Sequence, residues 1–114
     1  MARRPVAKGR QPRAAEIREP LGRIDRLLEH RVRLAIAVLL SRWDRLSFSR
    51  LRELTGETDG SLGAHLRRME DAEYVTADKE FVDRKPVTWY ALTRAGREAL
   101  AAHLGALEDL IGPR

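Results

Sequence analysis

Residues Ser47–Tyr74, with the sequence SFSRLRELTGETDGSLGAHLRRMEDAEY, decide the fold of this 114-residue chain. They predict two short helices separated by a tight turn. In the first helix, Phe48, Leu51 and Leu54 recur every third residue and therefore share one face. Gly56 stands where this helix should end, because glycine adopts the left-handed conformation without steric cost.

The second helix of this stretch is predicted to have one apolar face and one face of small and basic residues. Either Thr58 or Asp59 can cap it by accepting a hydrogen bond from a free backbone N–H group. The inward face is formed by Leu62, Leu66 and Met69. The outward face is formed by Gly60, Ser61, Gly63, Ala64, Arg67 and Arg68. Small residues allow close approach to a groove and arginines bind phosphates, so the pattern indicates a helix-turn-helix whose second helix contacts DNA.

The basic character of the chain is concentrated at its N-terminus. The net charge is +5, and residues 1–18 hold six basic side chains and one acidic side chain. The rest of the chain holds 16 basic and 16 acidic side chains, so the body must bind nucleic acid through local patches. We predict that residues 1–16 form a basic disordered arm, which is either simply solvated or contacts phosphates or a minor groove.

Length and composition restrict the class of protein. The length suits a single domain, which we place at residues 17–111. No cysteine is present, which excludes disulfides and thiolate metal sites and fits a cytoplasmic location. No apolar segment follows the basic N-terminus as a secretory signal requires, and the longest apolar run, Leu34–Leu40, is too short to cross a bilayer.

The chain lacks a pattern of catalytic or metal-binding residues. Its histidines, His30, His65 and His103, are scattered, and no Ser-His-Asp set or carboxylate pair has a useful spacing. The acidic residues of the last predicted helix are poorly placed for tetrahedral ligation. We therefore expect no enzymatic activity, no cofactor and no metal.

Two helices are predicted before the helix-turn-helix. An apolar stripe at helical spacing is formed by Ile17, Leu21, Ile24 and Leu28. Pro20 interrupts this stripe, so we expect a frayed lead-in and then a short helix over Leu21–Leu28. His30–Trp43 is the most apolar stretch and should lie at the centre of the core. Arg33 should lie at the margin of this helix, and His30 should have a structural or capping role.

After the second helix of the opening stretch, the pattern changes to that of strands. Tyr74–Ala77 and Val87–Leu92 are rich in β-branched and aromatic residues, which predicts a β-hairpin. The polar residues 78–86 between them should form a long loop with basic side chains at its tip. Phe81 and Val82 are unusual in this loop, and they either fold back onto the body or extend the first strand.

The C-terminal segment predicts a last helix over residues 93–111, which Thr93 caps. Its apolar residues follow a heptad-like spacing and are Leu100, Leu104, Leu107 and Ile111. On so small a domain this seam favours a dimer interface. The alternative is that the seam packs within the chain on the first helices.

Four motifs in this order point to one family. They are His30-x-x-Arg33-Leu34-Ala35-Ile36, Phe48-Ser49-x-Leu51-x-x-Leu54-Thr55-Gly56, Asp59-Gly60-x-Leu62-x-x-His65-Leu66-x-x-Met69 and Arg84-Lys85-Pro86-x-Thr88-x-Tyr90-x-Leu92-Thr93-x-x-Gly96-Arg97. With them, the chain resembles the winged-helix (winged helix-turn-helix) transcriptional regulators of the MarR-like and ArsR-like groups over roughly Ile24–Leu107. The resemblance implies a mainly α fold with a small β-hairpin (α+β), in the order α-α-α-β-β-α. In one departure, Glu73 stands where the family usually has a glycine just before the wing.

The resemblance also implies which residues contact DNA. On the recognition helix and the wing these are Ser61, Gly63, Ala64, His65, Arg67 or Arg68, Arg84 and Lys85. For His65, a partly buried structural role is as well supported as a base contact, because it adjoins the apolar stripe. Related proteins hold effectors in pockets at the dimer interface, and no residue pattern marks one here.

Together these features predict a sequence-specific regulator of transcription that binds double-stranded DNA as a homodimer. The recognition helix, residues 59–72, would enter the major groove, and the wing, residues 78–86, would reach the adjacent minor groove. The alternative is a winged helix that binds another protein and not DNA. The neutral body and the acidic end of the second helix favour that alternative.

Overall fold

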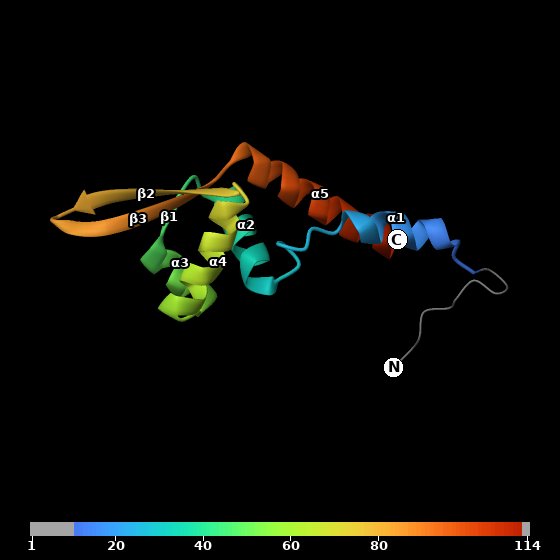
Figure 1. Ribbon diagram of the computed structural model, residues 1–114, viewed down its shortest axis with the longest axis horizontal. Helices are drawn as coiled ribbons and strands as arrows, with labels where there is room; N and C mark the ends of the chain where they lie inside the picture. The colour runs from blue at the N-terminus through green and yellow to red at the C-terminus, as the bar shows by residue number, and fades with distance from the viewer. Residues whose placement is uncertain (1–10, 113–114) are drawn as a thin grey trace.

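The structure of the protein, a computed structural model, describes residues 11–112 and contains five helices and a small sheet; the hairpin β2–β3 projects at one end and α1 at the other (Figure 1). The elements are α1 (Ala14–Arg23), α2 (Arg31–Arg42), β1 (Leu46–Ser47), α3 (Phe48–Thr55), α4 (Asp59–Asp71), β2 (Val75–Val82), β3 (Lys85–Leu92) and α5 (Arg94–Ile111). The strands pair antiparallel in the order β1-β3-β2. This arrangement confirms the predicted α+β winged-helix fold and adds β1, a two-residue strand that the predicted order of elements did not include. In the described residues, no helix is long and apolar enough to cross a bilayer.

The helix-turn-helix forms as its sequence predicts. The Ser47 hydroxyl accepts a hydrogen bond from the Arg50 N–H (3.1 Å) and so caps α3. Gly56 ends α3 in the left-handed conformation at φ 71°. Of the two candidate caps for α4, Thr58 is the one used, because its hydroxyl accepts from the Ser61 N–H at 3.2 Å. The helix ends at Asp71, one residue before the predicted end of the recognition helix.

The core lies between α2 and the helix-turn-helix. Its fully buried large side chains are Leu28, Ile36, Leu40, Leu51, Leu62, Leu66, Met69 and His103. His30 caps α2, because its ring Nδ1 accepts from the Val32 N–H at 3.2 Å, which confirms its predicted role. Arg33 was predicted at the margin of α2 and is instead only 9% exposed. The guanidinium is retained inside because the Leu27 carbonyl and the His65 ring accept hydrogen bonds from it.

The wing, β2 with β3, differs from the predicted long loop. The pairing runs from Val75↔Leu92 to Val82↔Lys85, so only Asp83 and Arg84 form the turn. Both residues have positive φ, 51° and 66°, as two-residue hairpin turns of type I′ require. The prediction of a loop over residues 78–86 is therefore wrong, and Phe81 and Val82 extend the first strand. Pro86 fits in β3 because β1 pairs only with Trp89 and Tyr90 and leaves this part of β3 without a second neighbour.

Helix α1 begins at Ala14 and continues through Pro20 to Arg23, so the predicted helix over Leu21–Leu28 is wrong. It also begins inside the stretch predicted as a disordered arm, of which residues 1–10 lie outside the described residues. Pro20 has no N–H group to donate a backbone hydrogen bond, and side-chain contacts stabilise the helix instead. Pro20 is buried, and Arg23 donates to Glu19 at 2.6 Å and to Asp109 of α5 at 2.6 Å.

The apolar residues predicted to form a seam along α5 lie partly in the core and partly on an exposed surface. Leu100 is 5% exposed and packs in the core of its own chain, so the exposed part of the predicted seam begins further along α5. Leu104 and Ile111 are 40% and 64% exposed. Figure 1 shows why: α1 and the C-terminal half of α5 lie side by side and project away from the body. We call this pair of helices the α1–α5 extension.

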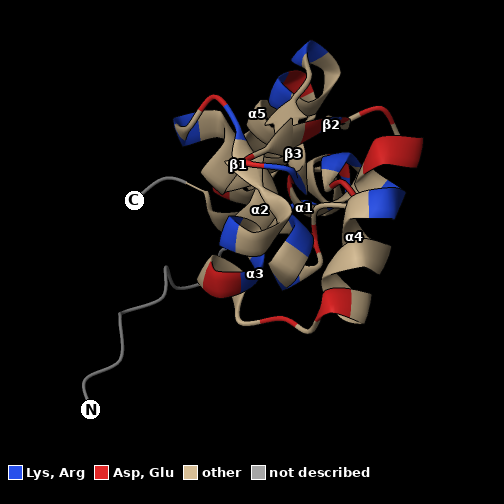
Figure 2. Ribbon diagram, turned by 90° about the vertical axis from the view of Figure 1, so that its left-hand side faces the viewer, with Lys and Arg blue, Asp and Glu red and all other residues tan. Residues whose placement is uncertain are grey.

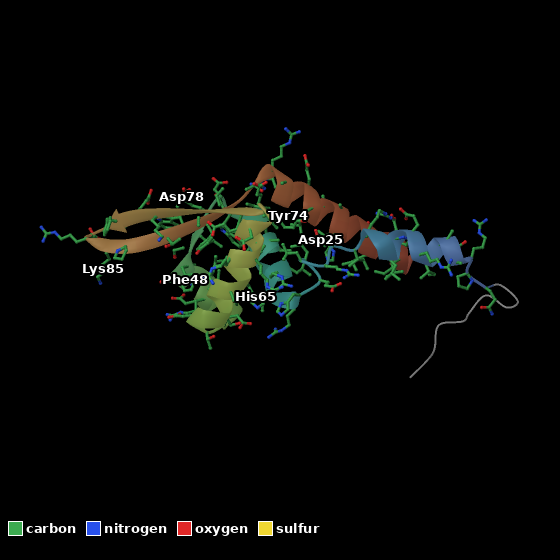
Figure 3. All side chains as sticks on the ribbon, viewed as in Figure 1. Asp25, Phe48, His65, Tyr74, Asp78 and Lys85 are labelled. Carbon is green, nitrogen blue, oxygen red and sulfur yellow. The ribbon has the colours of Figure 1, made fainter. Side chains whose placement is uncertain are left out.

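Tyr74 joins the wing, the extension and the helix-turn-helix, as Figure 3 illustrates with Asp25 close by. Its hydroxyl donates to the Asp25 carboxylate at 2.5 Å, and burial together with this bond raises the pKa of Tyr74 to about 12. Its carbonyl oxygen accepts from the Thr93 N–H at 2.9 Å. Asp25 in turn donates its N–H to the Nδ1 of the buried His103 on α5, at 3.0 Å. Glu73, just before this joint, has φ 63°, which is the conformation that the family's usual glycine would favour.

Candidate DNA-binding surface

The outward side of α4 presents small side chains and two arginines to solvent. Ala64, Arg67 and Arg68 are exposed, and Ser61 and Gly63 are half-buried. A Cβ atom built on Gly63 would meet no atom within 4 Å, so the surface at this glycine is open. The structure therefore brings the predicted contacts of the recognition helix onto one accessible surface, with His65 at its edge.

The positive charge of this surface comes from individual side chains and not from one large basic patch. Figure 2 shows basic and acidic segments intermixed over α2, α3 and α4, in agreement with a neutral body. Asp59 at the start of α4 pairs with Arg52 at 3.0 Å, which removes one exposed acidic charge from the helix N-terminus. Within residues 11–112, neither Arg67 nor Arg68 lies within 4 Å of a carboxylate oxygen. The two arginines are thus available for phosphates.

The two arginines occupy different flanks of α4. Arg67 and Arg68 are consecutive residues of α4, so their side chains leave the helix about 100° apart. Arg68 lies three residues after His65 and shares its flank of α4, and besides burial it lowers the pKa values of Arg33 and His65. An elongated polyanion lying across α4 would meet one positive charge on each side.

The wing carries its cations far from the body. Arg84 and Lys85 are exposed at the hairpin tip, and Figure 3 shows Lys85 at the far end from α4 and α5. The alternation along the strands places Phe81 on the same side of the hairpin as Lys79 and Tyr90. Phe81 is 80% exposed, which is unusual for a phenylalanine. Phe81 is unusual in the sequence as well, but its residue type alone does not indicate a DNA contact.

His65 has a structural contact inside the protein and is also partly open to solvent, so both roles predicted for it are compatible with its position. It is half-buried, and its Nδ1 lies 3.0 Å from the Nη1 of Arg33. Its ring is 4.3 Å from that of His30, centroid to centroid. Burial lowers the pKa of His65, and the nearby His30, Arg33 and Arg68 lower it further. The structure thus gives His65 a structural contact that the spacing of residues could not reveal.

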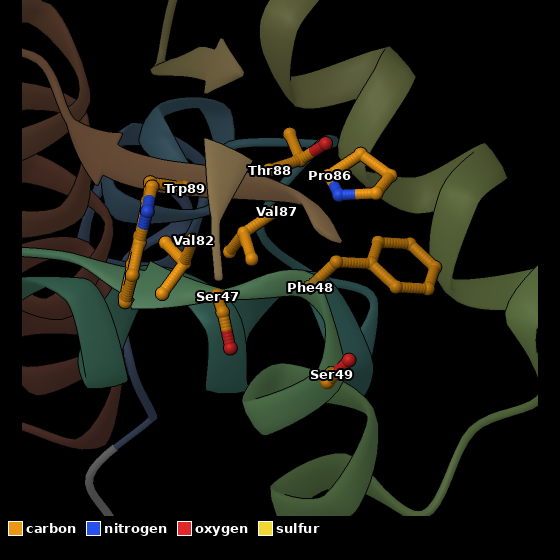
Figure 4. Close-up of a pocket in the computed structure, with 8 residues that line it drawn as sticks. All are labelled: Ser47, Phe48, Ser49, Val82, Pro86, Val87, Thr88 and Trp89. Atoms are coloured by element: carbon orange, nitrogen blue, oxygen red, sulfur yellow. The ribbon is translucent and has the colours of Figure 1, made fainter. Parts of the chain in front are cut away.

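A pocket of about 500 Å³ lies where the wing meets the N-terminus of α3 (Figure 4). Its walls are Ser47, Phe48, Ser49, Val82, Pro86, Val87, Thr88 and Trp89. The Nε1 of Trp89 is buried and has no hydrogen-bond partner in the part of the chain that the structure describes. The guanidinium carbon of Arg45 lies 4.2 Å from the centre of the Trp89 ring and covers its other side. Among residues 11–112, no three His, Asp or Glu side chains are grouped closely enough to hold a metal ion.

Comparison with known proteins assigns the family. Residues 32–111 match the family described as "Winged helix DNA-binding domain". The chain therefore belongs to the winged-helix proteins and is a DNA-binding transcriptional regulator. Among curated proteins, none matches the sequence significantly.

Solved structures agree with this class. A transcriptional regulator homologue from Pyrococcus horikoshii OT3 is 29% identical with a TM-score of 0.74, over 84% of this chain and 93% of that one. A protein from Thermoplasma acidophilum assigned as a transcriptional regulator is 26% identical with a TM-score of 0.60, over 73% and 85% of the two chains. ZitR of Lactococcus lactis, a zinc-responsive MarR family member, shares the fold at 16% identity and a TM-score of 0.55, over 71% and 55% of the two chains.

Proposed function

We propose that this regulator recognises a specific sequence of double-stranded DNA, with α4 in the major groove and the wing at the adjacent minor groove. The observation that carries the proposal is the outward side of α4. Its small residues let the helix approach base edges closely, and Arg67 and Arg68 flank it without carboxylate partners among the described residues. Ser61 and Ala64 supply a hydroxyl group and a methyl group for base contacts.

The wing fits this placement because it is long and basic at its tip. Each strand has eight residues, which at about 3.4 Å per residue gives a hairpin on the order of 25 Å long. Arg84 and Lys85 can therefore reach a groove next to the one that α4 occupies. The protein-binding alternative would use the exposed Phe81 of the wing, whereas Arg84 and Lys85 at its tip favour DNA.

A homodimer is proposed because the α1–α5 extension leaves apolar side chains uncovered. Ile17 and Leu21 of α1 are 39% and 54% exposed, and Leu104 and Ile111 of α5 are 40% and 64% exposed. Burial of such side chains stabilises by about 25 cal/mol per Å² of apolar surface removed from water. A second copy with the same apolar surface would cover them and double the number of phosphate contacts.

The basic N-terminal residues are proposed as a further grip on DNA, and the site of action as the cytoplasm. Six basic side chains within residues 1–18 are enough to add several phosphate contacts once the body is docked. Such contacts carry no sequence information, so removal of residues 1–11 should weaken binding to all sequences alike. A change of sequence preference would contradict this role of the arm.

A salt titration of DNA binding tests the proposed function. Fluorescence anisotropy would give the dissociation constant of the full chain for a selected duplex between about 50 and 200 mM salt. Affinity should fall steeply, by about 10³-fold or more if each dimer contacts six or more phosphates. Affinity that hardly changes with salt would refute DNA binding through the proposed surface and favour the protein-binding alternative.

A pair of charge substitutions tests the dimer. Leu104→Asp and Ile111→Asp place carboxylates on the uncovered part of the extension, and sedimentation should show monomers. Leu54→Asp is the matched control, since Leu54 is 45% exposed on α3 and lies outside the extension. A dimer that persists in both extension variants would show that this surface does not mediate association.

A further inference from the structure

Arg33 in α2 is a buried arginine without an acidic partner among residues 11–112. Arg33 is 9% exposed. Its Nε donates to the Leu27 carbonyl at 2.6 Å and its Nη1 to the Nδ1 of His65 at 3.0 Å. Within residues 11–112, no carboxylate oxygen lies within 4 Å of its guanidinium, although a buried charge is usually paired. Burial lowers the pKa of Arg33, and Arg68 lowers it further.

The hydrogen bonds of two histidines fix their tautomers. A guanidinium has only N–H donors, so the Nδ1 of His65 must be the acceptor in its bond with Arg33. The Nδ1 of His30 likewise accepts, from the Val32 N–H. Each neutral ring therefore has its proton on Nε2 and presents a donor on the side away from these contacts. The centroids of the two rings are 4.3 Å apart, so the rings are in contact.

We define the His–Arg cluster as His30 and Arg33 from α2 with His65 and Arg68 from α4. His30 and Arg68 are exposed, His65 is half-buried and Arg33 lies behind them. Two carboxylates act on the cluster from a distance and oppose its positive charge: Glu57 raises the pKa of His65 and Glu29 raises that of Arg33. Neither is within 4 Å of a cluster nitrogen, so the exposed edge offers donors and positive charge only.

We propose that the His–Arg cluster binds a backbone phosphate of the DNA at the α2 flank of the recognition helix. The Nε2–H groups of His30 and His65 donate to the phosphate, the guanidinium of Arg68 pairs with it, and the buried charge of Arg33 faces it from behind. A phosphodiester fits this cluster for two reasons. Its several oxygens can accept hydrogen bonds from the histidine donors, and its negative charge pairs with the two arginines. The inference rests on the proposed function, because it takes DNA to lie along α4.

The position of the cluster favours DNA over a free anion. Ser61, His65 and Arg68 recur at four and three residues and share one flank of α4, next to the small outward residues. A groove occupied by that outward surface brings one sugar-phosphate strand along this flank. Arg67, about 100° further around α4, would meet the other strand.

The test uses the full chain and a mixed-sequence duplex of about 30 base pairs, because phosphate contacts do not depend on sequence. Anisotropy at pH 8 would give affinity and its salt dependence for each variant. Arg68→Gln removes the cationic partner, and Arg94→Gln is the matched control, since it removes the same charge from an exposed residue at the start of α5. His30→Asn keeps an oxygen that can cap α2, and its shorter NH2 group does not reach the Nε2 position of the outer donor.

Two substitutions separate binding from folding at His65. His65→Asn retains an acceptor near the Nδ1 position, and its NH2 group is too short to reach the Nε2 position. His65→Gln places its NH2 group near the Nε2 position and has no acceptor at Nδ1. We expect Arg68→Gln to reduce the salt slope by about one relative to Arg94→Gln. His30→Asn and His65→Asn should weaken binding about three- to tenfold with unchanged melting temperature and unchanged slope, since neutral donors are lost.

The outcomes distinguish this inference from the proposed function. Failure of the wild-type chain to bind duplex DNA with a steep salt dependence would refute the proposed function itself. If the wild type binds in that way, but His30→Asn and folded His65→Asn bind as tightly as Arg94→Gln, the phosphate site is overturned. His30→Asn alone decides the question if the His65 variants do not fold.

Discussion

Replacement of Gly96 by alanine should destabilise the protein more than any other single methyl addition to a helical glycine of this chain. A Cβ atom there would lie 2.2 Å from the carbonyl oxygen of Tyr74 and 2.7 Å from the Cδ1 of Leu92. Because real Cβ contacts are not shorter than 3.0 Å, α5 would have to move by at least the 0.8 Å difference. That oxygen also accepts from the Thr93 N–H, so the movement strains the bond that joins wing and helix. Overpacking and a weakened hydrogen bond together should cost about 2 to 4 kcal/mol.

Gly105→Ala is the matched control in the same helix, since a Cβ atom there would meet nothing within 4 Å. It should increase stability by about 0.5 to 1 kcal/mol, because alanine favours helix over glycine. Urea unfolding followed by circular dichroism, at equal protein concentrations, would measure both free energies of unfolding. A Gly96→Ala protein within about 0.5 kcal/mol of wild type would refute the close contact with Tyr74.

Three further substitutions test other parts of the molecule. Glu73→Gly should raise the free energy of unfolding by about 1 kcal/mol because φ is 63° there, and Ala72→Gly, at φ −81°, should lower it; equal effects would argue against strain. Tyr74→Phe removes the 2.5 Å bond to Asp25 and should cost about 1 to 2 kcal/mol in thermal melting, whereas an unchanged melting temperature would show that the bond contributes nothing. The pKa of His65 is lowered from 6.5 in the folded protein, so the unfolded chain takes up the proton first and stability is lost as pH falls below about 6.5. Stability of the His65→Gln protein should depend less on pH between about 7 and 5, and a parallel profile would contradict this origin.

Local signals in the sequence were sufficient for the helix-turn-helix. Ser47, Gly56 and Thr58 act within a few residues of themselves, so their capping roles follow from residue type and position alone. The wing turn could not be predicted in the same way. Asp83 and Arg84 adopt positive φ without a glycine or an asparagine, and the usual signal of a two-residue hairpin turn is therefore absent.

Errors elsewhere came from contacts between distant residues. Pro20 indicates a break in a helix, but packing of α1 on α5 keeps the helix intact, and that packing involves Asp109, 86 residues beyond Arg23. Arg33 has the charge of a surface residue, and its burial depends on His65, 32 residues away. The candidate DNA contacts on α4 could be placed from helical spacing, whereas the His–Arg cluster could not, because no local pattern shows that α2 and α4 meet there.

The joint at Tyr74 links the elements proposed for DNA binding to those proposed for dimerisation. Its N–H donates to the Met69 carbonyl in α4, its carbonyl accepts from Thr93 before α5, and its hydroxyl donates to Asp25 before α2. In a dimer held by the α1–α5 extension, the distance between the two recognition helices would depend on this joint. Since two half-sites lie about 34 Å apart per turn of DNA, a small change in the angle of the extension would displace one helix from its groove. Substitutions at Asp25 or Tyr74 should thus weaken binding to a two-site operator more than binding to a single half-site, although neither residue lies on the DNA-binding surface.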